Sequence, residues 1–168
     1  MIDYTPRART DFLAVHCSDT PPDMDIGEVE IRRWHQAKGW IDLGYNIVIR
    51  RDGLIEIGRP LDYRGAHVKG ANHKAIGICL VGGRKQDSNE PENNFTPLQF
   101  DSLIVALKFC WKYAPGAIAK GHRDFPGVMK DCPCFDVGEL LQMNGLSVTG
   151  RMIESTKNPF ELINGEEA

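Results

Sequence analysis

Three side chains that are far apart in the sequence could together bind a metal ion: His16, His122 and Cys132. Two imidazoles and one thiolate suit zinc, and a set of three protein ligands leaves a fourth position open for water, as in catalytic zinc sites. Zinc lowers the pKa of a bound water to about 7, so that hydroxide is available at neutral pH. This pattern therefore predicts a hydrolytic zinc site. The alternative from spacing alone is two structural histidines and a buried thiol.

A lysine precedes the cysteine of this set by two residues. Pro133 disfavours helical geometry at the residue before it and favours an extended conformation for Cys132. In an extended segment, side chains two residues apart project to the same side, so Lys130 would place its ammonium group beside the metal. A cation there could stabilise the oxyanion that forms when hydroxide attacks a carbonyl.

The segments around these residues predict how a fold would bring them together. Residues 12–17 (FLAVHC) form a nearly continuous apolar run, typical of a buried strand. Because side chains alternate along a strand, His16 and Cys17 should face opposite ways, with Cys17 in the core. Residues 117–121 predict a short strand that leads directly into His122. The end of a strand is where α/β sheets place functional groups.

The remaining pattern predicts an α/β fold with a mixed sheet. Residues 75–81 read as another buried strand, and residues 45–50 and 54–58 as a hairpin around a glycine-containing turn. Helices are expected over 26–38, from Thr96 to about 114, and over 135–142; Thr96 and Gln99 fit a capping box. We expect His35, on the first helix, to have a packing role. Strands interleaved with helices indicate a central sheet flanked by helices.

Composition limits the class of protein. The 168 residues fit one domain, and a net charge of −3 gives no global basic field for nucleic acid. We expect the domain to span residues 1–144, and residues 145–168 to form a tail that is docked, through Phe160 and Leu162, or flexible. Five irregularly spaced cysteines argue against a disulfide framework and favour a reducing compartment. No apolar run is typical of a signal peptide or a membrane span, so we expect neither secretion by a signal peptide nor membrane insertion.

Five sequence blocks, in order, make the chain resemble a known family. They span roughly residues 10–142 and read VHCSDT (15–20), EIRRWHQAKGWIDLGYNIVIRRDG (30–53), GAHVKGANHKAIGICLVGG (65–83), NFTPLQ (94–99) and GHRDFPGVMKDCPCFD (121–136). With these blocks the chain resembles the zinc-dependent N-acetylmuramoyl-L-alanine amidases of the type-2 amidase and peptidoglycan-recognition-protein superfamily. Within that superfamily it is most similar to the small amidases of short-tailed coliphages. The resemblance implies the peptidoglycan-recognition-protein fold.

The resemblance also implies roles for individual residues. His16, His122 and Cys132 stand at the family's three zinc-ligand positions. Further positions carry expected roles in catalysis (Tyr45 and Lys130) or in the substrate groove (His67 and Asn72). One departure is Cys134, which stands where relatives carry a small polar residue. In an extended segment both thiols could face the same way, so Cys134 is an alternative ligand or a disulfide partner under oxidation. Cys132 is favoured because it keeps the family spacing Lys-x-Cys-Pro.

The implied activity is hydrolysis of the amide between the lactyl group of N-acetylmuramic acid and L-alanine, with one zinc ion per chain. A monomeric phage endolysin would remain in the host cytoplasm until another protein released it to the cell wall. Three alternatives remain: a recognition module that has lost catalysis, a regulator that binds and inhibits the phage RNA polymerase, and a cytoplasmic enzyme that recycles muropeptides. Retention of all the implied metal-site and catalytic residues argues against the first.

Overall fold

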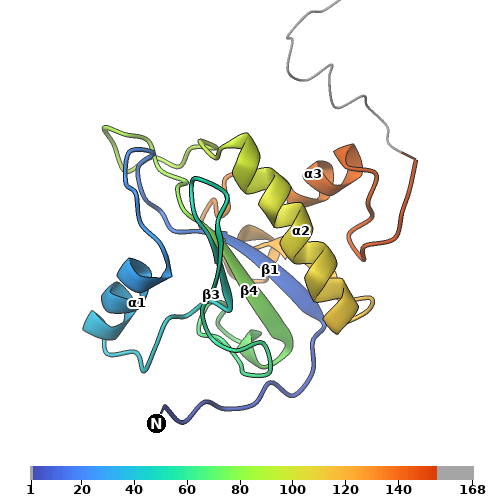
Figure 1. Ribbon diagram of the computed structural model, residues 1–168, viewed down its shortest axis with the longest axis horizontal. Coiled ribbons are helices and arrows are strands. Elements are labelled where there is room, and N and C mark those ends of the chain that lie inside the picture. Colours follow the sequence, from blue (N-terminus) through green and yellow to red (C-terminus); the bar gives the residue numbers. More distant parts are fainter. Residues whose placement is uncertain (1, 155–168) are drawn as a thin grey trace, which may run out of the picture.

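A five-stranded mixed sheet forms the centre of the molecule (Figure 1). The computed structural model describes residues 2–154. The strand order is β3-β2-β4-β1-β5, in which β2, β4, β1 and β5 run parallel and β3 is antiparallel to β2. The strands are β1 (Phe12–Cys17), β2 (Ile47–Ile49), β3 (Ile55–Ile57), β4 (Ala75–Leu80) and β5 (Ile118–Gly121). The mixed sheet and the β2–β3 hairpin agree with the sequence prediction.

Strand β1 lies inside the sheet, between β4 and β5. Its register pairs His16 with Cys79 of β4 and Val15 with Gly121 of β5. A strand with parallel neighbours on both sides and cover on both faces needs apolar residues along its whole length. The apolar run at 12–17 meets that need, and its predicted bounds are those of the strand. The residue after Gly121 is His122, so the ends of β1 and β5 bring both histidines to one edge of the sheet.

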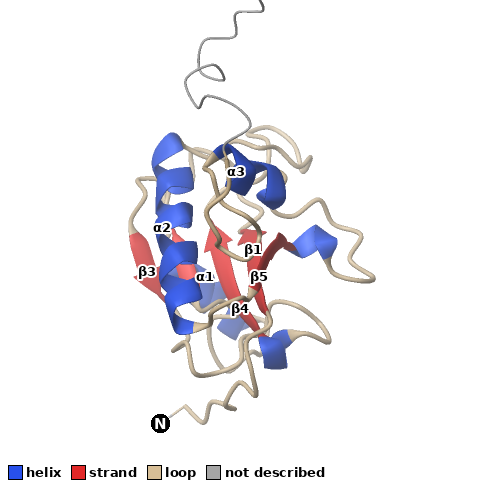
Figure 2. Ribbon diagram, turned by 90° about the vertical axis from the view of Figure 1, so that its right-hand side faces the viewer, coloured by secondary structure: helices blue, strands red, loops and turns tan. Residues whose placement is uncertain are grey.

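Helices cover the two faces of the sheet, with α2 on one side and α1 on the other (Figure 2). The helices are α1 (Glu28–Ala37), α2 (Pro97–Tyr113) and α3 (Val137–Met143), with 3₁₀ turns at η1 (Asn72–Lys74) and η2 (His122–Asp124). The predicted capping box begins α2, because the Thr96 side chain accepts a hydrogen bond from the Gln99 amide. The Gln99 side chain also donates to the backbone carbonyls of Ile49 and Val81, which fixes the start of α2 against β2 and the end of β4.

Because side chains alternate along β1, its residues pack on opposite faces of the sheet. Leu13, Val15 and Cys17 pack into the large cluster that includes the buried face of α2. Ala14 packs into a separate cluster with residues of the opposite face. His16 has the same parity as Ala14 and therefore faces away from α2, while Cys17 lies in the core as expected. His16 thus lies on the face of the sheet that α2 leaves free.

The chain continues to pack after α3. Leu146 is buried in the α2-side cluster and forms a bridge with Met152. The carbonyl of Val148 accepts a hydrogen bond from the Ala119 amide of edge strand β5 at 2.8 Å. Residues from 145 to about 152 therefore dock on the domain, whereas Phe160 and Leu162 lie outside the described residues. Among the described helices, none has the length and apolar character to cross a membrane.

Candidate metal centre

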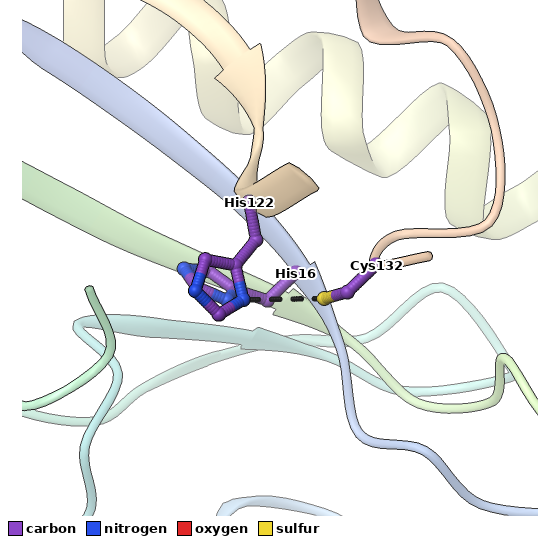
Figure 3. Close-up of side chains that lie close together, drawn as sticks. All are labelled: His16, His122 and Cys132. Carbon is purple, nitrogen blue, oxygen red and sulfur yellow. Dashed lines mark hydrogen bonds between the residues drawn. The ribbon is translucent and has the colours of Figure 1, made fainter. Parts of the chain in front are cut away.

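The three predicted ligands come together at the edge of the sheet where β1 and β5 end. One donor atom from each of His16, His122 and Cys132 lies within 4.8 Å of the other two. His16 is the penultimate residue of β1, His122 opens the 3₁₀ turn after β5, and Cys132 comes from the loop that follows (Figure 3). Three donors from separate segments face one another around a common point. This arrangement is what a metal ion requires.

The two ring nitrogens of His16 have different partners. Nδ1 faces the Cys132 sulfur at 3.9 Å, so it is the nitrogen that belongs to the donor set. Nε2 faces away from that set and lies 3.0 Å from Nδ1 of His67. The His16 ring is almost completely buried, at 1% exposure, which fixes its orientation. Sequence reasoning did not anticipate the contact with His67.

Backbone interactions hold Cys132 in place. The Arg123 amide donates to the Cys132 carbonyl at 2.8 Å and thereby ties the cysteine loop to the turn that carries His122. The Cys17 amide, at the end of β1, donates to the Cys132 sulfur at 3.3 Å. This hydrogen bond fixes the position of the sulfur relative to the end of β1. The absence of a side chain at Gly121 is also necessary, because a Cβ there would lie 2.8 Å from the Pro133 ring.

All the histidines around the centre favour the neutral form. Burial, with a further contribution from His67 and His122, holds the pKa of His16 well below its ordinary value. Burial and the nearby charge of Lys130 also lower the pKa of His122. For His67, burial lowers the pKa to about 3. Neutral imidazoles keep a free lone pair, so these rings are in the state required of metal ligands or hydrogen-bond acceptors at neutral pH.

The metal centre opens into a cleft of about 550 Å³. Lys130 is exposed and lines this cleft together with Cys132, as the sequence predicted for residues two apart. Tyr45 lines the cleft as well. Sequence reasoning missed several other lining residues, because they follow no chemical motif: Ser18, Asp19, Lys38, Ala66, Gly83, Asn89, Pro91 and Asp131.

Tyr45 lies beside the first histidine of the donor set, with its ring centroid 5.2 Å from that of His16. Burial raises the pKa of Tyr45 well above its ordinary value, and the Cys79 and Cys132 thiols add to the shift. The phenol therefore stays protonated at neutral pH and can donate a hydrogen bond. His35 supports this segment, because its Nδ1 accepts from the Gly44 amide at 2.9 Å. His35 is buried and has a structural contact, as expected for a packing role.

Cys134 does not belong to the three-atom donor group. Its backbone has a φ of +74°, which departs from the extended conformation considered for this segment. Its sulfur donates to the carbonyls of Gly83, at 3.2 Å, and Asp131, at 2.8 Å. It also lies 4.0 Å from the Cys17 sulfur. The two thiols around Pro133 therefore have different surroundings, and the one in the donor group is Cys132.

The two predicted groove residues have different positions: His67 lies in the loop before η1, and Asn72 is the first residue of η1. The Asn72 side-chain oxygen accepts from the amides of His67 and Val68, each at 2.8 Å. His67 lines the metal cleft, whereas Asn72 lines a neighbouring hollow that shares Trp40 and Ala66 with the cleft. Asn72 thus shapes the loop that carries His67.

Comparison with known proteins identifies the family. The model of the N-acetylmuramoyl-L-alanine amidase family matches residues 6–135, and the chain belongs to that family. An endolysin of Klebsiella phage KP32 is 45% identical over 148 residues, which cover 86% of this chain and 94% of the relative. An endolysin of Escherichia phage T7 is 40% identical over 150 residues, covering 89% and 97%. The chain thus spans nearly the whole length of these phage relatives.

Solved structures of the same fold include both enzymes and recognition proteins. An endolysin amidase from Clostridium intestinale superposes with a TM-score of 0.62 and 26% identity, covering 79% of this chain and 84% of that structure. The endolysin of the Thermus scotoductus phage Ph2119 has a TM-score of 0.67 at 21% identity, covering 83% and 88%. The Drosophila peptidoglycan-recognition protein LB has a TM-score of 0.65 at 23% identity, covering 79% of each chain. The last two likenesses establish the fold, which is the one expected from the sequence.

Proposed function

We propose that this protein is an endolysin that hydrolyses the amide bond between the lactyl group of N-acetylmuramic acid and L-alanine in peptidoglycan. The observation that carries the proposal is the convergence of His16, His122 and Cys132 on one point, within 4.8 Å, at the base of an open cleft. Membership of the amidase family supports hydrolysis of this amide bond, and the two phage endolysins at 40% identity or more support peptidoglycan as the substrate.

The donor set fits zinc. Two neutral imidazoles and a thiolate are ligands that zinc prefers, and three of them leave a position for water or substrate. The hydrogen bond from the Cys17 amide to the Cys132 sulfur, at 3.3 Å, holds that sulfur in the donor group. His16, through Nδ1, His122 and Cys132 would hold the ion. Bound there, zinc supplies a Lewis acid that polarises the substrate carbonyl and makes water nucleophilic near pH 7.

Two further side chains in the cleft have roles that follow from their protonation and position. Tyr45 remains protonated, so its hydroxyl can donate a hydrogen bond to the carbonyl oxygen as negative charge develops there. Lys130 lines the same cleft as the donor set, and its positive charge contributes to the lowered pKa of His122. Both groups stabilise the tetrahedral intermediate of amide hydrolysis better than the planar amide, and this difference lowers the barrier.

The products of digestion test this assignment. Purified sacculi should release new L-alanine amino termini without new reducing sugar ends. New reducing ends would indicate a glycosidase, and free amino groups on other residues of the stem peptide would indicate a peptidase. Comparing polymeric sacculi with soluble muropeptides separates an endolysin from a recycling enzyme. We expect cleavage of the polymer; cleavage of muropeptides alone would overturn the endolysin assignment and leave the amidase chemistry intact.

Binding to the phage RNA polymerase, which the resemblance implies for some relatives, also stays a prediction. It would depend on surface residues rather than on the metal centre. A pull-down with the polymerase of the cognate phage at micromolar concentration tests it, and no retention at that concentration would remove this regulatory role.

A further inference from the structure

The contact between His16 and His67 restricts where their protons can be. His16 Nδ1 faces the Cys132 sulfur and His16 Nε2 lies 3.0 Å from His67 Nδ1. A histidine that binds a metal through one nitrogen carries its proton on the other. With Nδ1 in the donor set, the His16 proton must lie on Nε2 and point at His67 Nδ1. His67 Nδ1 must then accept a hydrogen bond from that N–H and cannot carry a proton itself.

The far side of the His67 ring fits this assignment. A neutral imidazole that accepts at Nδ1 carries its own proton on Nε2. His67 Nε2 is buried and has no hydrogen-bond partner of good geometry among the described residues. The backbone of Ala75 lies close to the His67 ring.

We propose that His67 is a positioning residue for the metal centre, which accepts a hydrogen bond from the Nε2–H of His16 and so fixes the ring through which His16 binds zinc. This inference rests on the proposed zinc site and changes the role expected for His67, from contact with substrate to support of a ligand. Metal-bound histidines commonly donate their second N–H to an outer partner, and loss of such a partner weakens metal binding. Here the partner is a second neutral imidazole.

The surroundings of His67 hold its ring in the accepting position. A Cβ at Gly77 would lie 2.6 Å from the His67 ring, and a Cβ at Gly65 would also collide with it. The His67 ring therefore packs directly against the backbone of these two glycines, where any side chain would displace it. The backbone of the same residue is fixed by Asn72, whose side chain accepts from the His67 amide at 2.8 Å. Asn72 thus supports the metal centre indirectly, by holding the backbone of His67.

Two nearly isosteric replacements isolate the hydrogen bond. In His67→Asn the amide oxygen stands close to the original Nδ1 and can accept from His16. In His67→Leu the side chain has a similar shape and no acceptor. Competition for zinc with a chromogenic chelator, without substrate, should show roughly 10–100-fold weaker binding for the leucine variant. The asparagine variant should stay close to the wild-type protein. Circular dichroism and thermal melting of the zinc-free proteins check that both variants fold.

A second measurement on the wild-type protein does not depend on either variant folding. Nitrogen-15 NMR of the zinc-loaded protein should show the His16 proton on Nε2 and the His67 proton on Nε2. A proton on His16 Nδ1 would overturn the proposal. So would equal zinc affinity in the leucine and wild-type proteins with a raised KM, because that result indicates substrate contact. Equal losses in both variants would indicate that ring size matters rather than the acceptor.

These readouts also separate this inference from the proposed function. If the wild-type protein binds no zinc, the proposed metal centre and the role of His67 fail together. If zinc binds and the two variants do not differ, only the role of His67 fails. If the variants differ as expected but sacculi yield no new L-alanine amino termini, the amidase assignment fails and His67 remains a positioning residue.

Discussion

The backbone amide of Cys17 donates a hydrogen bond to the sulfur of Cys132, at 3.3 Å, and joins the end of β1 to the cysteine loop. The Cys17 side chain packs in the same cluster as Cys132, and its sulfur lies 4.0 Å from that of Cys134. Cys17 therefore contacts both thiols of the Cys-Pro-Cys segment, and its backbone amide donates to the sulfur of Cys132. Only the thiol that receives the amide faces the two histidines.

This difference predicts opposite behaviour for two matched serine variants. Cys132→Ser should lose zinc, because the hydroxyl replaces the thiolate in the donor set. Cys134→Ser should retain one zinc per chain, since its sulfur contacts the carbonyls of Gly83 and Asp131 instead. Metal analysis after dialysis measures both. Zinc retained in the first variant and lost in the second would exchange the assignments of the two cysteines.

Removal of the Lys130 side chain should slow catalysis without releasing zinc. By analogy with the deletion of an oxyanion-stabilising donor, Lys130→Ala should raise the barrier by about 2.7–4 kcal/mol, or roughly 10²–10³ in kcat. Lys38→Ala is a matched control, because Lys38 is an exposed lysine that lines the same cleft from the end of α1. Turnover on sacculi measures both. An unchanged kcat in the Lys130 variant would remove this lysine from the mechanism.

Tyr45→Phe tests the phenol hydroxyl and keeps the ring that packs 5.2 Å from His16. We expect loss of turnover by about 10²-fold or more with zinc content unchanged, since the hydroxyl donates to the developing oxyanion. Tyr63→Phe is the control, because Tyr63 packs against Tyr4 and does not line the cleft. Full activity on sacculi in the Tyr45 variant would exclude a role for its hydroxyl.

The buried His35 should make the stability of the zinc-free protein depend on pH. Burial lowers its pKa to about 4; Lys38 and Arg59 add to this effect, and Asp42 opposes it. The unfolded chain, with a histidine pKa near 6.5, binds more protons between these two values. Folding stability from this residue is therefore complete above about pH 6.5 and is lost as the pH falls toward 4.

A single variant isolates that contribution. His35→Asn keeps an acceptor for the Gly44 amide and removes the titrating group. Between pH 7 and pH 4 the unfolding free energy of the wild-type protein should fall relative to this variant by up to about 3 kcal/mol. Urea unfolding at several pH values measures the difference. A constant difference over this range would mean that the folded protein accommodates the charged ring without cost.

Local features of the fold could be predicted because their causes are local. The apolar run at 12–17 sets the bounds of β1, and the Thr96–Gln99 capping box sets the start of α2. The positions of His16 near the end of one strand and of His122 just after another follow from the same patterns. The strand order β3-β2-β4-β1-β5 could not be derived in this way, because it depends on which buried strands pair over long distances.

The parts of the site that sequence reasoning missed depend on tertiary contacts. The contact of His16 with His67 joins residues that are 51 positions apart. The sequence signals it only through Gly65 and Gly77, whose lack of a side chain leaves room for the His67 ring. Cys134 departs from the extended conformation because its backbone takes the left-handed region, with a φ of +74°. Because the segment is not extended at Cys134, counting residues could not separate the two thiols.

The most direct test of the account is to measure zinc content and amidase activity on the same preparation, before and after chelation. We predict one zinc per chain, release of L-alanine amino termini from sacculi, loss of that activity with the metal, and recovery when zinc is restored. Zinc without activity would contradict the catalytic assignment. Activity that survives complete removal of the metal would contradict the role of the His16, His122 and Cys132 centre.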